Sequence, residues 1–448
     1  MTEHQKYYFP KFSSSSEVLN EIYCYREFVF QKHIREVPGG HIITEFYPPV
    51  PWAGLYNTIS CAASHHIRDG RWLTDPTPVC EYTRFWSDPE APTRVYSFPF
   101  ADSVMALTEV TGDHTFADEM YKSLRDNYKA WCETHRRKNK MFYQNDGYDG
   151  MEYSISGSGL RPTINSYMYA DACALAEIAA RTGKEKDAAY FAEETAFLKQ
   201  AINDVLWNQK DGFYETVHEE GDCANVREQI GYVPWIYGIP PENEDREKAF
   251  LQLWDKNGFY GEYGPTTAER RHPDFMKKFD HECLWNGPSW PFATTQTLSA
   301  MITLLQNYEQ NTVSDEDFLK LLTIYAKSHH DGDRPYIDEN LDADTGKWIA
   351  RDILQETNDP FCGRGEDYNH SAFIDLVIRG VCGIIPSTGN VLTVAPLGTS
   401  LSEFNLNGVR IHGHTVDVLW KQTEGLRVYT DGILRASNED GSRVTLAL

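Results

Sequence analysis

The chain has 448 residues and a formal net charge of −24 at pH 7, and 41% of its residues are hydrophobic. That length and composition allow a large buried core in one large domain or in a few smaller ones. The acidic balance argues against nucleic acid and against an anionic membrane surface as partners, because both require a basic protein surface. No run of about 18 apolar residues is present, so no membrane span is predicted.

The chain starts with MTEHQKYYFPKF, in which no basic segment is followed by an apolar one, so a secretory signal is not predicted. The nine cysteines are scattered, and none forms a CxxC pair. An odd number of dispersed cysteines is typical of reduced thiols. We therefore predict a cytoplasmic protein.

Most of the chain up to about residue 385 has apolar residues three and four positions apart, which is typical of amphipathic helices. This pattern predicts helices over 18–34, 103–112, 116–135, 164–183, 185–207, 291–308, 316–329 and 371–384. It is weaker over 54–68, 78–87, 227–237 and 244–255. Gly112 and Gly183 follow two of these helices, where glycine suits a left-handed helix end, and Ser314 is placed to cap the start of another.

The connections between these helices differ greatly in length. Some have two or three residues, whereas others are long and rich in Gly, Asp, Trp and Tyr, at 36–53, 137–163, 208–226, 256–290 and 330–368. Long loops in a compact domain are usually functional or disordered, and these are too aromatic for disorder. About twelve helices, joined by short turns on one side and long loops on the other, predict an all-α (α/α)6 toroid over 1–388. Its active site would lie in the mouth formed by the long loops.

After about residue 388 the apolar period changes from helical spacing to two. Segments such as TVDVLWKQ and LRVYTDG alternate apolar and polar residues and end at Gly or Asn turns, which is typical of strands. We predict that 389–448 forms a small antiparallel, β-sandwich-like domain. A packing role is commoner for such an appendage than a ligand-binding one.

The first candidate for chemistry is the run NDGYDGMEYSISGSG at 145–159, which places Asp146, Asp149 and Glu152 within seven residues. A calcium-binding EF-hand does not fit, because Tyr148 stands where an oxygen ligand is required. The residues alone leave two interpretations open. The run is either a surface turn built on two Asp-Gly pairs or one half of a pair of catalytic carboxyls.

A second group of acids lies in the late loops. The segment 334–352 contains Asp338, Glu339, Asp342 and Asp344, and the segment 363–373 contains Glu366 and Asp367. In a toroid of six helix pairs, loops near one third and near the end of the chain face each other across the mouth. A protonated carboxyl there could donate to a leaving oxygen while an ionised one activates water. The Trp- and Gly-rich segments 45–57 and 280–292 would supply surface for stacking sugar rings.

Other kinds of site have weaker support. His65–His66 and His329–His330 are adjacent pairs, and adjacent helical residues do not share a face, so no metal site is predicted from them. The GSG at 157–159 does not follow a strand and is not a nucleotide-binding loop.

Several motifs resemble those of a known group of enzymes. GMEYSISGSGLRPTINSYMYADACALAEIA is similar to a segment of inverting (α/α)6 glycosidases, namely the glycoside hydrolase family 63 α-glucosidases and the mannosylglycerate hydrolase-like enzymes. LWNGPSWPFAT, ENLDADTGKW and EDYNHSAFIDLVIRG resemble their later motifs, in the same order. The resemblance covers roughly residues 40–385. It implies a six-hairpin glycosidase that acts on a small oligosaccharide or glycoside and requires no metal or organic cofactor.

The resemblance also assigns roles to residues. It implies that Glu152 is the general acid and Glu339 the general base of a reaction that inverts the anomeric configuration. Asp149 and Glu366 are the alternative acid and base. The residues expected around the sugar are Trp52, Tyr56, Asn57, Arg161, Trp285, Asn286, Trp290, Glu366 and His370.

Two departures from the family pattern affect the expected substrate. The general acid is usually Asp and here is Glu152, and a Trp-Asp pair that holds sugar hydroxyls in relatives is Trp52-Ala53 here. We predict an α-glucoside or α-mannoside as substrate, and the Trp52-Ala53 change leaves an unusual sugar such as rhamnose or arabinose open. Two alternatives are a sugar epimerase on the same barrel, with His281 and His370 as bases, and a barrel that binds a glycan without catalysis.

Overall fold

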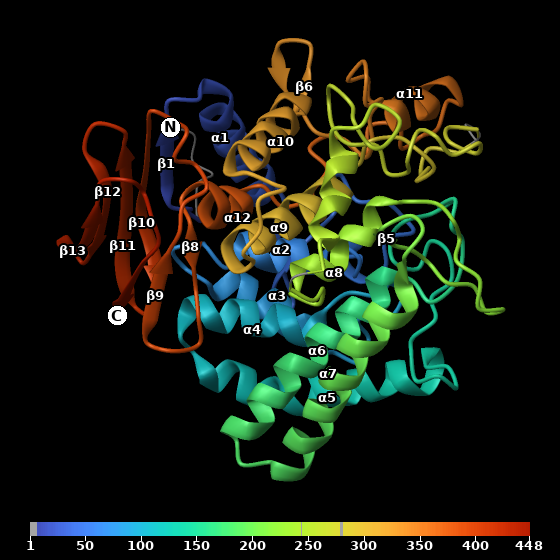
Figure 1. Ribbon diagram of the computed structural model, residues 1–448, viewed down its shortest axis with the longest axis horizontal. Coiled ribbons are helices and arrows are strands. Elements are labelled where there is room, and N and C mark those ends of the chain that lie inside the picture. Colours follow the sequence, from blue (N-terminus) through green and yellow to red (C-terminus); the bar gives the residue numbers. More distant parts are fainter. Residues whose placement is uncertain (1–6, 243, 278–280) are drawn as a thin grey trace.

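The computed structural model describes residues 7–242, 244–277 and 281–448. Helices form the larger part of the molecule, and an antiparallel sheet lies at one side, at the left of Figure 1. The α-helices are α1 (Glu17–His33), α2 (Ala63–Gly70), α3 (Thr77–Phe85), α4 (Phe100–Thr111), α5 (His114–His135), α6 (Pro162–Arg181), α7 (Glu185–Ala201), α8 (Val233–Ile236), α9 (Pro291–Asn307), α10 (Asp315–Ser328), α11 (Ile349–Glu356) and α12 (Ile374–Leu376).

Shorter helical segments complete the helical part. The 3-10 segments are η1 (Leu55–Asn57), η3 (Gln229–Tyr232) and η4 (Arg246–Leu253), and the π segments η2 (Ile202–Leu206) and η5 (Val377–Val381) continue α7 and α12. All eight strongly periodic segments of the sequence therefore contain helix, as predicted. The weaker ones are shorter or tighter than predicted. For example, 227–237 consists of η3 and the single turn α8, which has a proline in its first turn.

The predicted helix ends are confirmed. Gly112 and Gly183 have φ of 71° and 69°, the left-handed conformation that glycine adopts without a steric penalty. Ser314 forms a capping box with Asp317 at the start of α10. These local signals could be predicted because they depend on neighbouring residues alone.

Six helices contact one another in a closed cycle. In this cycle α2 packs on α4, α4 on α6, α6 on α8, α8 on α9, α9 on α12 and α12 on α2. Other helices pack against members of the cycle, namely α3 on α2, α5 on α4 and α6, α7 on α6, α10 on α9 and α1 on α12. The cycle members α6 and α9 bury most of their residues, whereas α7 buries one face. An apolar stripe confined to one face is what a helix packed on one side requires.

The strands form one larger sheet and several small ones. They are β1 (Lys11–Ser14), β2 (Ile34–Val37), β3 (Gly40–Ile43), β4 (Trp207–Asn208), β5 (Phe213–Tyr214), β6 (His330–Asp331), β7 (Arg334–Pro335), β8 (Ile384–Ile385), β9 (Val391–Val394), β10 (Glu403–Ile411), β11 (His414–Lys421), β12 (Gly425–Thr430), β13 (Ile433–Asn438) and β14 (Val444–Ala447). The larger sheet has the order β1-β10-β11-β12-β13, and a three-stranded sheet has the order β14-β9-β8.

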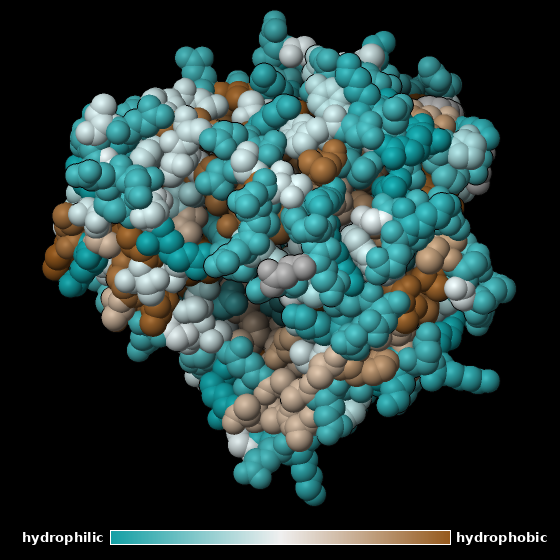
Figure 2. Space-filling model, in the orientation of Figure 1, coloured by the Kyte–Doolittle hydropathy of each residue, from teal (hydrophilic) through white to brown (hydrophobic). Residues whose placement is uncertain are grey.

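The larger sheet joins distant parts of the chain. β1, near the start of the sequence, pairs antiparallel with β10, with Lys11 opposite Asn407. Apolar side chains alternate along the central strands β10, β11 and β12, and those that face inwards are buried. On the face drawn in Figure 2 the surface is mainly hydrophilic, and brown areas at the left edge lie over this sheet, where Ile433 and Leu434 are exposed.

The long connections between helices position the candidate site. Four of the five predicted long loops, at 36–53, 137–163, 256–290 and 330–368, contribute residues to one cavity. The helices hold the ends of these loops, so residues far apart in the sequence are brought together. Within the described residues, every helix is too short or too polar to cross a lipid bilayer.

Candidate active site

The candidate site is a cavity of about 330 Å³. This volume lies near the lower end of the range for small-molecule sites, about 300–1,000 Å³. Its lining residues are Glu45, Phe46, Trp52, Ile59, Cys61, Tyr96, Gly150, Glu152, His281, Glu282, Cys283, Trp285, Trp290, Phe292, Glu339, Asp359, Arg364, Tyr368 and His370. Aromatic walls with a few carboxyls are the composition that a sugar site needs, because sugar rings have both apolar faces and hydroxyls.

Glu152 enters the cavity from a tight loop. Both Asp-Gly pairs form turns, with Tyr148 N–H donating to the Asn145 carbonyl at 3.2 Å and Gly150 N–H to the Gly147 carbonyl at 2.9 Å. Gly147 has φ of 87°, and a Cβ there would lie 3.1 Å from Cγ of Glu152. The run is therefore a pair of turns, and these turns place Glu152 against the cavity, as the interpretation with a catalytic carboxyl requires.

The environment of Glu152 favours its neutral form. Burial raises the pKa of its carboxyl to about 8, and the negative charges of Asp149, Glu339 and Asp146 add to the rise. Its backbone carbonyl accepts a hydrogen bond from Trp285 N–H at 3.1 Å, which links the loop to the aromatic wall. A carboxyl that stays protonated near neutral pH can act as a general acid.

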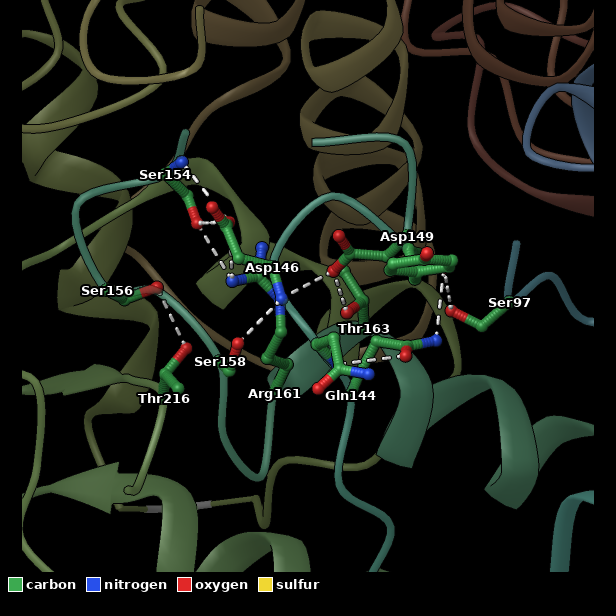
Figure 3. A network of polar contacts seen from close by, with 12 residues as sticks. Ser97, Gln144, Asp146, Asp149, Ser154, Ser156, Ser158, Arg161, Thr163 and Thr216 are labelled. Atoms are coloured by element: carbon green, nitrogen blue, oxygen red, sulfur yellow. Dashed lines mark hydrogen bonds and ion pairs between the residues drawn. The ribbon is translucent and has the colours of Figure 1, made fainter. Parts of the chain in front are cut away.

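Asp149 has a different place in the same loop. Its Oδ2 accepts from Arg161 Nε at 2.7 Å and from Thr163 Oγ1 at 2.6 Å, and both side chains of the Asp149–Arg161 pair are fully buried. Arg161 also donates to Ser154 Oγ at 2.9 Å and to the Gly157 carbonyl, so it lies at the centre of the network in Figure 3. Asp149 and Arg161 support the loop from behind and do not line the cavity.

Glu339 faces the cavity from the loop after β7, and it is 1% exposed. Its Oε1 accepts from Arg364 Nε at 3.2 Å and its Oε2 from Cys283 Sγ at 3.3 Å. Burial raises the pKa of its carboxyl to about 7, while the positive charge of Arg364 opposes that rise. The guanidinium therefore favours a carboxylate at Glu339, which is the form that a general base needs.

Two neighbours fix the geometry around Glu339. Arg364 also donates from Nη2 to Glu282 Oε1 at 2.6 Å, so it bridges two carboxyls. Asp338 accepts from the backbone N–H of Glu339 at 2.7 Å. A Cβ at Gly365 would lie only 1.8 Å from Asp338 Oδ1, so this close approach requires glycine.

The aromatic wall is formed chiefly by two stacked indoles. Trp285 and Trp290 have ring centroids 4.3 Å apart and planes 14° apart, and both are buried. Trp290 Nε1–H donates to the Leu284 carbonyl at 2.8 Å, which fixes the orientation of the ring. Trp52 is half exposed, packs edge-on against Phe361 and lies under the Arg364 guanidinium, 5.1 Å from its ring centroid.

His370 lines the cavity as expected, but its surroundings are apolar. It lies against Tyr368, with ring centroids 4.0 Å apart, and near Trp290 and Phe292. Burial holds the pKa of its imidazole well below the usual value, so the ring is neutral. Both ring nitrogens are buried, and hydrogen bonding to the backbone at Tyr368 and Glu339 partly opposes the fall in the pKa.

Other predicted residues lie away from the cavity lining. Asn57 is buried and holds its own loop, accepting from Val50 N–H and donating to the Phe46 carbonyl. Tyr56 packs against Phe85, and Asn286 is buried outside the lining. Glu366 is half exposed and pairs with Arg334 at 3.2 Å, outside the cavity. Its position makes it a poor alternative to Glu339.

The cavity also contains polar side chains that were not singled out from the sequence. They are Glu45, Cys61, Glu282, Cys283, Arg364 and Tyr368. Acids and arginines are common in loops, and only the fold reveals that these particular ones are buried. A weak signal was the position of Glu45 at the start of a Trp- and Pro-rich segment.

His281, Glu282 and Cys283 form one cluster of possible metal ligands, with ligand atoms within 4.8 Å of one another. Glu282 already holds Arg364, so a cation there would compete with the guanidinium. Such mixed ligands could suit a transition metal, yet the ion pair gives the cluster a role without one.

Comparison with known proteins identifies the family to which the residues around this cavity belong. Residues 55–371 match the family described as "Mannosylglycerate hydrolase MGH1-like glycoside hydrolase domain". The chain belongs to this family. The matched span of the MGH1-like glycoside hydrolase domain includes Glu152 and Glu339 and most of the cavity lining, whereas Glu45, Phe46 and Trp52 precede it.

Solved structures extend this similarity. A structure described as "Sialidase" is 36% identical, with a TM-score of 0.92, over 98% of this chain and 41% of that chain. A glycoside hydrolase family 63 mannosylglycerate hydrolase from Thermus thermophilus, in complex with glucose, is 14% identical with a TM-score of 0.54, over 74% of this chain and 98% of that chain. An α-L-rhamnosidase from Dictyoglumus thermophilum is 14% identical, with a TM-score of 0.62, over 95% and 45% of the two chains. The last two show a shared fold.

A curated relative from Borreliella burgdorferi, an uncharacterized protein, is 27% identical over 191 residues, which is 40% of this chain and 38% of that protein. The chain thus spans about 40% of the length of this relative and of the sialidase. The resemblance to six-hairpin glycosidases predicted from the motifs is confirmed.

Proposed function

We propose that the protein is an inverting glycoside hydrolase in which Glu152 is the general acid and Glu339 the general base. One observation carries the proposal: the partly buried Glu152 and the buried Glu339, from loops far apart in sequence, line one cavity, and only Glu339 of the two is held by a cation. The closed cycle of six helices supports the further proposal that the helical part is an (α/α)6 toroid with this cavity at its mouth. The free cysteines are in keeping with a cytoplasmic location.

The proposed reaction uses each carboxyl once. Glu152 donates its proton to the glycosidic oxygen while the bond from that oxygen to the anomeric carbon breaks. On the opposite face of the sugar, Glu339 takes a proton from a water molecule whose oxygen bonds to the anomeric carbon. The product has the inverted configuration, and the two carboxyls return to their starting states by exchange with solvent. This mechanism requires carboxyls about 6.5–9.5 Å apart, so that the water fits between them.

The proposed substrate class is an α-linked glucoside or mannoside of small size. The description of the family and the size of the cavity support it. A second candidate is an α-sialoside, because the relative described as a sialidase is 36% identical over nearly the whole of this chain. Arg364 and protonated carboxyls in the cavity could receive the carboxylate that such a sugar carries.

A substrate panel tests the proposed function. Nitrophenyl α-glucoside, α-mannoside and α-rhamnoside, mannosylglycerate and a methylumbelliferyl α-sialoside would be incubated with the protein, and NMR would identify the first-formed anomer. We expect hydrolysis of at least one, with inversion. Retention of configuration would overturn the roles of the two carboxyls. Isomerisation of a free monosaccharide would favour the epimerase, and affinity without turnover would favour a binding protein.

Substitution separates the two roles. We expect Glu339→Gln to lower kcat by about 10²–10⁴-fold for every substrate, because the base acts on all of them. Glu152→Gln should lower it similarly for poor leaving groups but far less for a dinitrophenyl glycoside, which leaves without a proton. Glu366→Gln is the matched control and should retain turnover. Near-normal hydrolysis of unactivated substrates by either of the first two variants would contradict the assignment.

A further inference from the structure

A third carboxyl faces the same cavity as the proposed acid and base. Glu45 lies just after β3, is 2% exposed and lines the cavity. Its Oε1 accepts a hydrogen bond from the Tyr368 hydroxyl at 2.6 Å, and the Cys61 thiol lies 3.9 Å from each of its oxygens. The mechanism proposed above uses two carboxyls and gives no role to Glu45.

The surroundings of Glu45 disfavour a negative charge there. Burial raises the pKa of its carboxyl to about 8, the hydrogen bond from Tyr368 opposes that rise, and Glu339 and Glu152 repel the charged form. Arg364 holds Glu339 rather than Glu45. Several titratable groups interact electrostatically with Glu45. Tyr368, Cys61, Glu152 and Glu339 shift the pKa of its carboxyl, and its negative charge raises the pKa values of Tyr82 and Tyr96.

The hydrogen bond from Tyr368 decides where the proton of Glu45 lies. The hydroxyl donates to Oε1, so a neutral carboxyl carries its proton on Oε2. That oxygen has the Cys61 thiol as its loose neighbour at 3.9 Å. A neutral carboxylic acid in a cavity is a hydrogen-bond donor, whereas an ionised one only accepts. Tyr368 thus leaves Oε2 as the oxygen from which this cavity-lining carboxyl can donate.

We propose that Glu45 is a substrate-binding residue that donates a hydrogen bond from Oε2 to an oxygen of the sugar bound between Glu152 and Glu339. The inference rests on the proposed function only in placing a sugar in this cavity. The accepting oxygen is a hydroxyl of a neutral sugar or the carboxylate of an acidic one, and the chemistry of the donor is the same. Deprotonation of Glu45 removes the donor, and for an acidic sugar it also adds repulsion.

Binding of free sugars tests this role without requiring turnover. D-Glucose, D-mannose and N-acetylneuraminic acid would be titrated into the wild-type protein and Glu45→Gln by calorimetry between pH 6.5 and 9.5. For the sugar that binds, we expect the wild-type Kd to rise toward tenfold per pH unit above about pH 8, because binding then requires uptake of one proton. Glu45→Gln keeps an N–H donor and cannot ionise, so its Kd should rise much less. Glu45→Ala should bind about tenfold more weakly at pH 7.

Glu27→Gln is the matched control, because burial also raises the pKa of Glu27, to about 7, in α1 and outside the cavity. It should follow the wild-type protein at every pH, and thermal melts would show that all variants fold. A Kd for Glu45→Gln that follows the wild-type pH profile would overturn the proposal, as would failure of all three sugars to bind the wild-type protein. Loss of turnover in Glu45→Gln at every pH would instead make Glu45 the general base, and this result would also overturn its proposed role in substrate binding. Binding without hydrolysis would contradict the proposed function alone.

Discussion

At the scale of single residues, Arg364 decides which cavity carboxyl carries a negative charge. Its guanidinium reaches Glu339 and Glu282 at once, and it is 5% exposed, so water screens these contacts little. Glu152 and Glu45 are more readily protonated, each with a pKa of about 8 against about 7 for Glu339. An acid with a higher pKa than its partner base is the order that an inverting reaction needs.

This order predicts the pH profile. kcat/KM should be bell-shaped with a maximum between about pH 7 and 8, because Glu339 must be ionised and Glu152 protonated. Arg364→Gln removes the cation that lowers the pKa of Glu339. The pKa of Glu339 therefore rises, and the acid limb of the profile moves to higher pH. A loss of an opposite charge typically changes a pKa by about 1–3, so activity at pH 7 should fall at least about fivefold.

The control for this prediction is Arg334→Gln, which removes the partner of the exposed Glu366. Its pH profile should match that of the wild-type protein. An unchanged acid limb in Arg364→Gln would show that another group sets it. A shift in Arg334→Gln would assign the acid limb to Glu366, the alternative base.

The motifs allowed Glu152 and Glu339 to be predicted, but they did not reveal Arg364 or Glu45. Arg364 and Glu366 are two positions apart, yet the first is buried in the cavity and the second is half exposed. Composition and spacing do not distinguish them, because burial depends on how the late loop folds over the helices. For the same reason, Arg161 was expected near the sugar and instead lies behind the loop of Glu152.

At the scale of elements, the loop over 145–159 depends on the Asp149–Arg161 pair. Removing one partner of a buried ion pair leaves an uncompensated charge and costs about 3–5 kcal/mol. We expect Asp149→Asn to lower the free energy of unfolding by this order, measured by urea denaturation. Asp146→Asn should cost less, since Asp146 is partly exposed and lies 3.7 Å from Arg161.

The same pair of variants tests whether Asp149 is the general acid. As a supporting residue, Asp149 should affect stability and kcat together, and a dinitrophenyl leaving group should not restore Asp149→Asn. Glu152→Gln should instead keep its stability and recover activity with that leaving group. A stable Asp149→Asn protein with leaving-group-dependent activity would transfer the acid role to Asp149.

Elements with strong periodicity were predicted, whereas the short elements α11 and β1 were not. α11 lies within a segment expected to be a loop, and its eight residues make only about two helical turns. β1 has only four residues and pairs with a strand almost 400 positions later. A strand this short is specified by its partner, not by its own sequence, so no local pattern could predict it.

At the scale of the whole molecule, the C-terminal sheet and the helices meet at the end of α4. His412, between β10 and β11, donates its backbone N–H to the Val110 carbonyl at 2.9 Å, and its ring lies within hydrogen-bond distance, 3.0 Å, of the Glu109 carbonyl. Gly112 ends α4 there, and a Cβ on it would lie 3.0 Å from the His412 ring. The proposed boundary near residue 388 therefore separates two parts that contact each other closely.

Gly112 and Gly183 together can measure that contact. Both end helices in the left-handed conformation, with φ of 71° and 69°, but around Gly183 a Cβ would meet nothing within 4 Å. Gly183→Ala should therefore lower the free energy of unfolding only by the cost of placing alanine in the left-handed conformation, about 1–2 kcal/mol. Gly112→Ala must also displace His412, so its free energy of unfolding should fall further, by about another 1 kcal/mol, the size of one hydrogen bond.

The shape of the unfolding curve shows whether the sheet and the helices unfold together. If the sheet and the helices unfold as one cooperative unit, Gly112→Ala should lower the midpoint of a single urea transition followed by circular dichroism and by tryptophan fluorescence, with the two probes coinciding. If the sheet is an independent domain, the same substitution should separate an early transition from the main one. Activity should be kept in both glycine variants, since neither residue lines the cavity. Equal losses for Gly112→Ala and Gly183→Ala would mean that the His412 contact contributes nothing to holding the sheet in place.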